Sequence, residues 1–138
     1  MIRSVLDTNV LFSAALKESG TPALVLELVE RGIITPCISD AIIAEYRDVL
    51  GRPVMLPHAR RAKKLLDLMA IFALYVSPAL KLSICSDADD NCFLECAVAA
   101  EAKYLVTGNI RHFPKNFSAV AIVTPRELLD RLIDAGLA

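Results

Sequence analysis

The stretch that most constrains the fold lies near the start of the chain, at residues 4–9, which read S-V-L-D-T-N. Two apolar residues suit the end of a strand that is buried on both faces, and Asp7 follows them directly. Because burying an unpaired carboxylate is costly, an acid in this place indicates a function. Ligands of open α/β sheets bind at the carboxyl ends of the strands. We therefore expect Asp7 and Thr8 to lie in a functional site, while Asn9 suits either that site or a turn.

Strands and helices alternate along the rest of the chain. Helical spacing of apolar residues and capping signals predict helices at 10–16, 23–31, 40–50, 59–74, 87–102 and 125–135. Strands are predicted up to residue 6 and at 33–38, 104–106 and 119–123. Thr21, Ser39 and Thr124 are the predicted N-caps. This alternation predicts an α/β fold of three layers, in which helices cover both faces of a mostly parallel, four- to five-stranded sheet with right-handed crossovers.

The composition is that of a folded globular domain with no membrane-spanning segment. The chain has 138 residues, of which 55 % are hydrophobic, so residues 1–138 are expected to form a single domain with an aliphatic core. No apolar run reaches the roughly 18 residues that a membrane span needs. The first residues lack the basic and apolar regions of a signal peptide, and we expect a cytoplasmic location.

Charge and cysteines give weaker indications. The net charge of −1 does not point to a nucleic-acid binder, although Arg60, Arg61, Lys63 and Lys64 form a local basic segment. The simplest interpretation of this segment is a solvated helix face. The cysteines lack the spacing of a zinc finger and are expected to be reduced and buried. They are Cys37, Cys85, Cys92 and Cys96.

Acidic residues recur where the predicted strands end. Asp7 follows the first strand, Glu45 lies within the third predicted helix, and the segment 87–90 contains three aspartates. Capping needs fewer acids than this segment has, and like charges repel unless a cation offsets them. Oxygen-rich clusters of this kind favour Mg²⁺ or Mn²⁺, which assist the hydrolysis of phosphodiesters. A surface position for Glu45 and simple capping for 87–90 are the alternatives.

At this point the sequence resembles the PIN-domain family, and in particular the VapC-type ribonucleases that act as toxins of toxin–antitoxin systems. Four segments carry the resemblance, in the order of the family and over nearly the whole chain. They are V-L-D-T-N-V-L at 5–11, S-D-A-I-I-A-E at 39–45, D-A-D-D-N-C-F-L-E-C-A at 87–97 and Y-L-V-T-G-N-I-R-H-F-P at 104–114. The resemblance implies a Rossmann-like PIN domain that hydrolyses RNA with Mg²⁺ or Mn²⁺.

The resemblance also implies roles for individual residues. The expected catalytic residues are Asp7, Glu45 and Asp90, with Asp87, Asp89 and Asn91 as competitors for the third place. The expected metal ligands are Asp7, Glu45, Asp87, Asp90 and Asn109. Supporting roles fall to Thr8, Asn9, Asn91 and Thr107, and RNA contacts to Arg52, Arg61 and Arg111. Asn109 stands where the family usually has a fourth acid, which weakens the case for a second metal. His112 is interpreted as structural rather than as a general base.

Three alternatives compete with this interpretation. A haloacid dehalogenase-type phosphoryl-transfer enzyme would need an acid at position 9 and a lysine near the later acids, and a receiver domain would need a lysine after the last strand. The third alternative is a PIN-like module that binds RNA or a protein without cutting, which Asn109 favours. If the protein is a nuclease toxin, the implied partners are RNA, a small antitoxin protein and a second copy of the chain in a homodimer, with no membrane.

Overall fold

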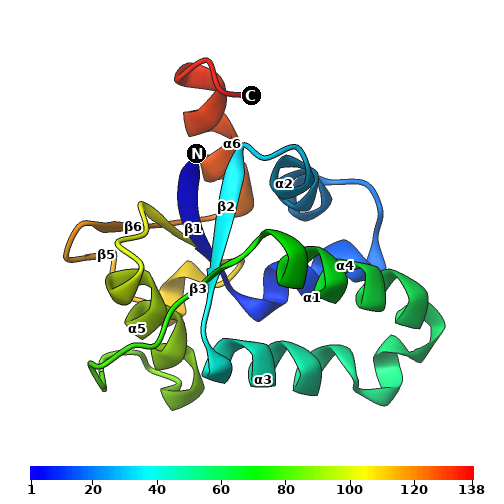
Figure 1. Ribbon diagram of the computed structural model, residues 1–138, viewed down its shortest axis with the longest axis horizontal. Coiled ribbons are helices and arrows are strands. Elements are labelled where there is room, and N and C mark those ends of the chain that lie inside the picture. Colours follow the sequence, from blue (N-terminus) through cyan, green and yellow to red (C-terminus); the bar gives the residue numbers. More distant parts are fainter.

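The computed structural model describes all residues, 1–138 (Figure 1). The strands are β1 Ile2–Leu6, β2 Ile34–Ile38, β3 Leu74–Tyr75, β4 Tyr104–Val106, β5 Asn116–Phe117 and β6 Val120–Val123. The α-helices are α1 Thr8–Leu16, α2 Thr21–Glu30, α3 Asp40–Leu50, α4 Ala59–Phe72, α5 Asn91–Ala99 and α6 Pro125–Asp134. Three short 3₁₀ helices are η1 Pro53–His58, η2 Ala88–Asp90 and η3 Ile110–His112.

One sheet runs through the molecule in the strand order β3-β2-β1-β4-β6-β5. Every neighbouring pair is parallel except β5 and β6, which form an antiparallel hairpin. The prediction of a mostly parallel sheet between helices is therefore confirmed. The sheet has six strands rather than four or five, because two-residue strands are added at both edges. Pro78 follows β3 closely, in keeping with the short edge strand found there.

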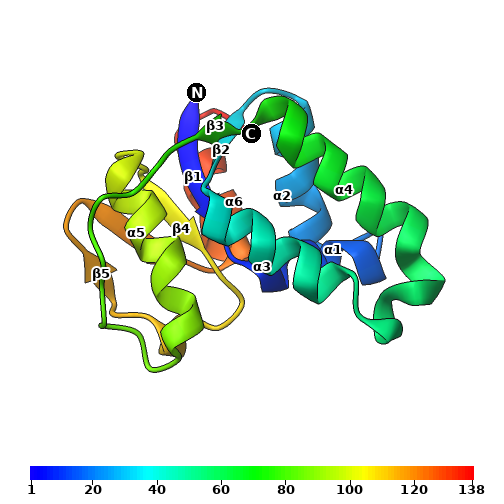
Figure 2. The ribbon, with the colours of Figure 1, turned by 60° about the horizontal axis from the view of Figure 1, so that its bottom comes forward.

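Helices cover both faces of this sheet. On one face, α5 packs against β1, β2 and β4, and on the other face α2 and α6 pack against each other (Figure 2). Helices α3 and α4 extend this second side as a pair joined by η1. The buried apolar residues form a single cluster that includes the fully buried Val5 and Leu6. Burial on both faces explains why β1 contains no alternating polar positions near its carboxyl end.

The element boundaries differ from the expectation at several points. Helix α1 begins at Thr8, directly after Asp7, rather than at residue 10. Thr21 is not a cap: Gly20, with φ of +104°, is the N-cap of α2, and Thr21 is its first helical residue. The predicted cap Ser39 is confirmed, since its side chain accepts a hydrogen bond from the Ile42 N–H. Thr124 caps α6 in the same way. The fifth helix begins with η2 and ends at Ala99, earlier than expected.

The register of the central strands brings two polar residues together. Leu6 pairs with Val106, so β1 and β4 end side by side. The backbone N–H of Asp7 donates to the Val106 carbonyl at 2.9 Å, and the N–H of Thr107 donates to the Val123 carbonyl at 2.9 Å. Asp7 and Thr107 therefore leave the sheet as neighbours at one edge.

All four cysteines are free thiols, as expected, but only two are buried. Cys37 and Cys96 lie in the core, whereas Cys85 and Cys92 are half-buried near the acidic segment 87–90, which corrects the expectation of full burial. Burial raises the pKa of Cys92 to about 12 and that of Cys85 to about 11. None of the helices has both the length and the apolar character to cross a bilayer.

Candidate active site

A cavity of about 320 Å³ opens at the carboxyl ends of the central strands and gathers most of the predicted site residues. Its acids come from three distant segments: Asp7 follows β1, Glu45 lies on α3, and Asp87 and Asp90 are the N-cap and the last residue of η2. Its complete lining is Asp7, Thr8, Asn9, Phe12, Glu45, Val49, Arg52, Asp87, Asp90, Asn109 and His112. The fold thus brings together acids that are more than 80 residues apart at their extremes, from Asp7 to Asp90.

Asp7 lies at the floor of the cavity and is 6 % exposed. Its Oδ2 accepts a hydrogen bond of 2.7 Å from the Thr107 hydroxyl. Burial raises the pKa of the Asp7 carboxyl, although the Thr107 hydroxyl and the backbone N–H groups of Thr8 and Asn9 lower it in part. The carboxylate is therefore held in place by hydrogen bonds that offset only part of the cost of burying its charge.

Asp90 lies across the cavity from Asp7, at the end of η2. Its Oδ2 is 3.4 Å from Nδ1 of His112, on η3. Burial, and then the negative charges of Asp7 and Asp87, raise the pKa of Asp90 to about 6, against a lowering by His112. His112 had been expected to be structural, and the structure places it in the cavity beside an acid.

Glu45 reaches the cavity from the middle of α3. The next residue, Tyr46, is buried, and its hydroxyl donates a 2.6 Å hydrogen bond to the Leu6 carbonyl at the end of β1. This bond fixes α3 against the strand that carries Asp7. Burial raises the pKa of Glu45, and the nearby acids Asp89 and Asp48 raise it further.

Thr107 organises the polar residues between β1 and β4. Its hydroxyl donates to Asp7 and accepts from the Asn109 N–H at 3.0 Å and from the Asn9 amide at 3.4 Å. Asn9 also accepts the Gly108 N–H at 3.0 Å. Asn9 therefore joins the two strand ends from the first turn of α1, which corrects the alternative expectation of a turn residue.

Asn91 does not line the cavity, but its side chain holds the segment that leads to the acids of the cavity. Its Oδ1 accepts the N–H groups of Ile84 and Cys85, and its Nδ2 donates to the Ala88 carbonyl. Glu95, one turn later on α5, accepts the Leu82 N–H at 2.8 Å. Together they fasten the irregular segment that leads into the acidic turn. Sequence reasoning missed Glu95, although an acid among the apolar residues of a buried helix was a signal for such a role.

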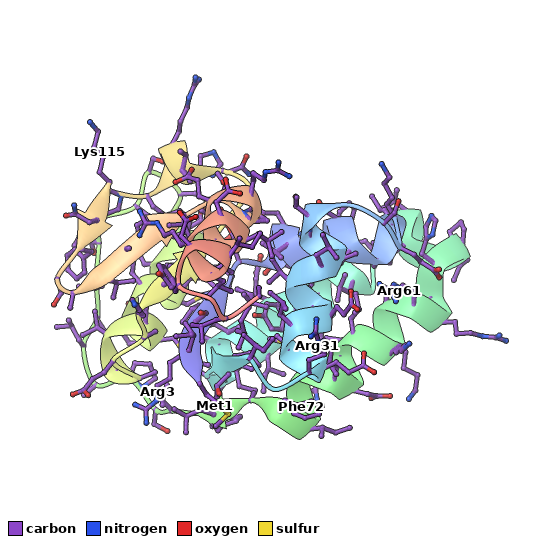
Figure 3. The ribbon with its side chains drawn as sticks, turned by 90° about the horizontal axis from the view of Figure 1, so that it is seen from above. Met1, Arg3, Arg31, Arg61, Phe72 and Lys115 are labelled. Carbon is purple, nitrogen blue, oxygen red and sulfur yellow. The ribbon has the colours of Figure 1, made fainter.

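The three predicted RNA-binding arginines are in different places. Arg52 lines the cavity and pairs with Asp48 at 3.0 Å, and Arg111 is exposed on η3, two residues beyond Asn109. Arg61 lies outside this cavity, on α4, and its Nε donates to the Ala14 carbonyl at 3.2 Å. Figure 3 shows Arg61 far from the β5–β6 hairpin and Lys115. Its expected role is thus separate from the acidic cavity.

The residues of the cavity suit a divalent cation in chemistry, but they do not yet have the geometry of a bound one. No three His, Cys, Asp or Glu side chains lie close enough together to hold one ion. The donors are carboxylates and amides, the oxygen groups that hard cations prefer, and burial together with the charges of Asp7 and Asp87 raises the pKa of Asp90. The buried hydroxyl of Thr8 has no hydrogen-bond partner. Asp7, Glu45 and Asp90 would therefore have to move closer together to share an ion.

Comparison with known proteins identifies the class. A parallel sheet with acids converging at its carboxyl edge defines an α/β domain with a polar site at the strand ends. A family model described as PIN domain matches residues 3–111. The chain belongs to the PIN domain family, which confirms the resemblance seen in the sequence.

Two individual proteins are also similar to this chain. The uncharacterized protein MJ1680 of Methanocaldococcus jannaschii is 27 % identical over 111 residues, which cover 78 % of this chain and 71 % of that protein. Among solved structures, VapBC2 from Rickettsia felis, crystallised with a DNA fragment from its promoter, matches with a TM-score of 0.61 and 20 % identity. The match covers 89 % of this chain and 98 % of the other, and it supports the fold.

Proposed function

We propose that this protein is an endoribonuclease that hydrolyses RNA phosphodiesters with Mg²⁺ or Mn²⁺. The observation that carries the proposal is the convergence of Asp7, Glu45 and Asp90 on one cavity at the sheet edge. Burial raises the pKa of all three carboxyls, and nearby acids raise those of Glu45 and Asp90 further, which disfavours the charged forms unless a cation binds among them. Membership of the PIN domain family supports the same chemistry.

In this proposal Asp7, Glu45 and Asp90 hold the ion, with Asp87 and Asn109 as further oxygen donors. The ion supplies an activated water and a positive charge beside the phosphodiester oxygen. The chain's own residues prepare the site: Thr107 orients Asp7, and His112 holds Asp90. Arg52 at the rim is placed to contact a substrate phosphate, and Arg111 lies beyond Asn109 on the exposed η3. The expected products carry a 5′-phosphate and a 3′-hydroxyl.

We extend the proposal to partners. The resemblance to VapC-type toxins supports a role as the toxin of a toxin–antitoxin pair, and the structural relative VapBC2 is an assembly described with promoter DNA. A small antitoxin is therefore the expected protein partner, and the toxin itself is expected to form a homodimer. Light scattering of the purified chain, alone and after co-expression with a neighbouring small gene product, would measure both associations.

A cleavage assay tests the nuclease proposal. Single-stranded and structured RNA are incubated with the wild type in Mg²⁺, in Mn²⁺ and in EDTA. Cleavage is expected only with a metal. Asp7→Asn should abolish it while the thermal unfolding midpoint stays within a few degrees of the wild type. Asp130→Asn is the matched control, because Asp130 is an exposed acid on α6 that pairs with Arg126. Undiminished cleavage by Asp7→Asn would contradict the assignment.

A second candidate function follows from Asn109. This residue lines the cavity and offers an oxygen without a charge, where the family usually has an acid. The absence of a negative charge at this position is consistent with a PIN module that binds RNA or a protein without cutting. Absence of cleavage by the wild type in both metals, with RNA binding retained, would favour this candidate. Gain of metal-dependent cleavage in Asn109→Asp would then identify the cause.

A further inference from the structure

A second cavity lies at the other end of α1 from the acids. Its volume is about 520 Å³, and it is lined by the end of α1, by η1 and by the first turns of α4. Four basic side chains face it: His58, Arg60, Arg61 and Lys64. Glu18 is the one acid in the lining. The cavity is therefore predominantly cationic in a protein whose net charge is −1.

The arginines and the lysine of this cavity are not neutralised by a neighbouring acid. Arg60, Arg61 and Lys64 form no ion pair within 4.0 Å, whereas Lys63, between them on α4, pairs with Asp67 at 2.9 Å. Arg61 uses only its Nε, which donates to the Ala14 carbonyl. That bond holds the guanidinium at the cavity and leaves its two terminal nitrogens available. Fixed, unpaired guanidinium groups suit phosphate recognition.

Helix α1 connects this cavity to the acidic one along a single face. Thr8 and Phe12 line the acidic cavity, and Ala15 and Leu16 line the basic one. Residues at these spacings lie on one side of a helix. The helix rises about 1.5 Å per residue, so the residues of α1 that line the two cavities, from Thr8 to Leu16, span about 12 Å along it. Figure 2 shows α1 beside α3, which also lines the acidic cavity, and beside α4, which also lines the basic one.

Among the residues of α1 that line the acidic cavity, Phe12 is the nearest to the basic cavity along the helix, and it is half-buried. Proteins that bind single-stranded nucleic acid combine a positively charged groove with aromatic side chains on which bases stack. Acids, an aromatic ring and a basic cavity therefore follow one another along α1 in the order that a strand passing away from its cut site would meet them.

We propose that this face of α1 is the track for single-stranded RNA. A base beside the cut phosphodiester stacks on Phe12, and a phosphate further along the strand binds Arg60, Arg61 and Lys64. This inference rests on the proposed ribonuclease function and adds the form of the substrate and the residues that grip it. Arg61 thereby has a place in substrate binding even though it lies outside the acidic cavity.

Binding measured without cleavage tests the track. In an Asp7→Asn background, affinities are measured by fluorescence anisotropy for labelled oligouridylates of two to eight nucleotides. Affinity is expected to rise about 10-fold once the strand is long enough to reach the basic cavity. In Arg60→Ala/Lys64→Ala this rise should disappear, and the dependence of log affinity on log salt should fall by about one unit. Adding Arg61→Ala to this double variant should not restore the rise in affinity with strand length.

Matched variants make the result specific. Lys63→Ala removes one positive charge from the same helix, outside the cavity, and should keep the rise with length, whereas Lys64→Ala removes one charge inside the cavity and should reduce it. Phe12→Leu should weaken binding of the hexanucleotide about 10-fold, and Phe12→Tyr should restore it. Thermal unfolding of each variant checks the fold.

Two results would overturn the proposal: an unchanged rise with length in Arg60→Ala/Lys64→Ala, or an equal loss in Lys63→Ala. If these variants instead weakened binding of a polyglutamate peptide and left RNA affinity unchanged, the cavity would be a protein-binding site. Because Asp7→Asn separates binding from hydrolysis, failure of the track is distinct from failure of the nuclease, which the metal-dependent cleavage of wild type tests.

Discussion

Thr107 is the residue on which the geometry of Asp7 depends most. It is fully buried, and its one hydroxyl serves Asp7, Asn9 and Asn109. A hydroxyl at this place meets two needs at once, because it satisfies a buried carboxylate and ties two strand ends together. Strand β4 ends with the apolar residues Leu105 and Val106, so the Thr107 hydroxyl that follows it is the first polar side-chain group beside Asp7.

Thr107→Val keeps the shape of the side chain and removes these hydrogen bonds. We expect the free energy of unfolding to fall by about 1–3 kcal/mol, because buried polar groups that bond to this hydroxyl are left without a hydrogen-bond partner. The pKa of Asp7 should rise further, because the Thr107 hydroxyl lowers it in the wild type. Mg²⁺ binding should then require a higher pH. Urea unfolding and calorimetric titration at several pH values measure both effects, and Thr107→Ser should behave like the wild type.

Asp90 makes the metal-free protein sensitive to pH. The pKa of its carboxyl is about 6 in the folded protein, against an ordinary value of 3.8. The folded state therefore binds the proton more tightly than the unfolded state does. The stability that this difference contributes is complete below about pH 3.8 and is lost as the pH rises through about 6.

Asp90→Asn removes the charge that causes this loss. In EDTA at pH 7.5 the variant should be more stable than the wild type by about 1 kcal/mol, a figure reduced for partial solvent screening. The two proteins should converge toward pH 4. Added Mg²⁺ should stabilise the wild type and not the variant. Urea unfolding measures these differences, and Asp67→Asn, at an exposed acid on α4, should show none of them. A variant less stable than the wild type in EDTA at pH 7.5 would refute this account.

At the scale of elements, α3 is fixed against β1 by a single buried hydrogen bond. Tyr46, the residue next to Glu45, makes this bond. Burial raises the pKa of the Tyr46 hydroxyl well above its ordinary value. The hydroxyl therefore stays protonated and remains a donor. The position of Glu45 relative to Asp7 depends on this link.

Tyr46→Phe should leave the Leu6 carbonyl unsatisfied and lower the free energy of unfolding by about 1–3 kcal/mol. The affinity for Mg²⁺ should fall as well, because α3 is freer to move. Tyr75→Phe is the matched control, since Tyr75 is half exposed on an edge strand and its hydroxyl contacts Asp40 at the surface. Equal stability losses in the two variants would show that the buried bond has no special role. Denaturant unfolding and calorimetric metal titration provide the comparison.

The elements also show how far the sequence could predict the site. Periodicity and caps identified the alternating helices and strands, and the acids after β1 and before α5 were visible because charge rarely ends a buried strand. The roles of Asn91 and Glu95 could not be predicted, because both depend on how the irregular segment 76–87 folds back. Two-residue strands such as β3 have too few residues to form a pattern. The placement of Arg61 likewise required the packing of α4 on α1.

At the scale of the whole molecule, the account rests on the parallel sheet. Parallel strands with right-handed crossovers end at one edge, so residues from both halves of the chain meet there. Three acidic segments and two cavities then lie along α1, at the edge of one rigid core. The topology of the sheet brings the acids together, and in the proposed function a bound cation offsets the repulsion between them.

Diffraction from crystals soaked in Mn²⁺ tests this claim most directly. The account predicts an anomalous peak in the cavity, at coordination distance from carboxylate oxygens of Asp7 and Asp90 and directly or through water from Glu45. The same soak of Asp7→Asn crystals should lose the peak. A wild-type crystal with Mn²⁺ bound elsewhere, and with these three carboxylates still apart, would contradict the account.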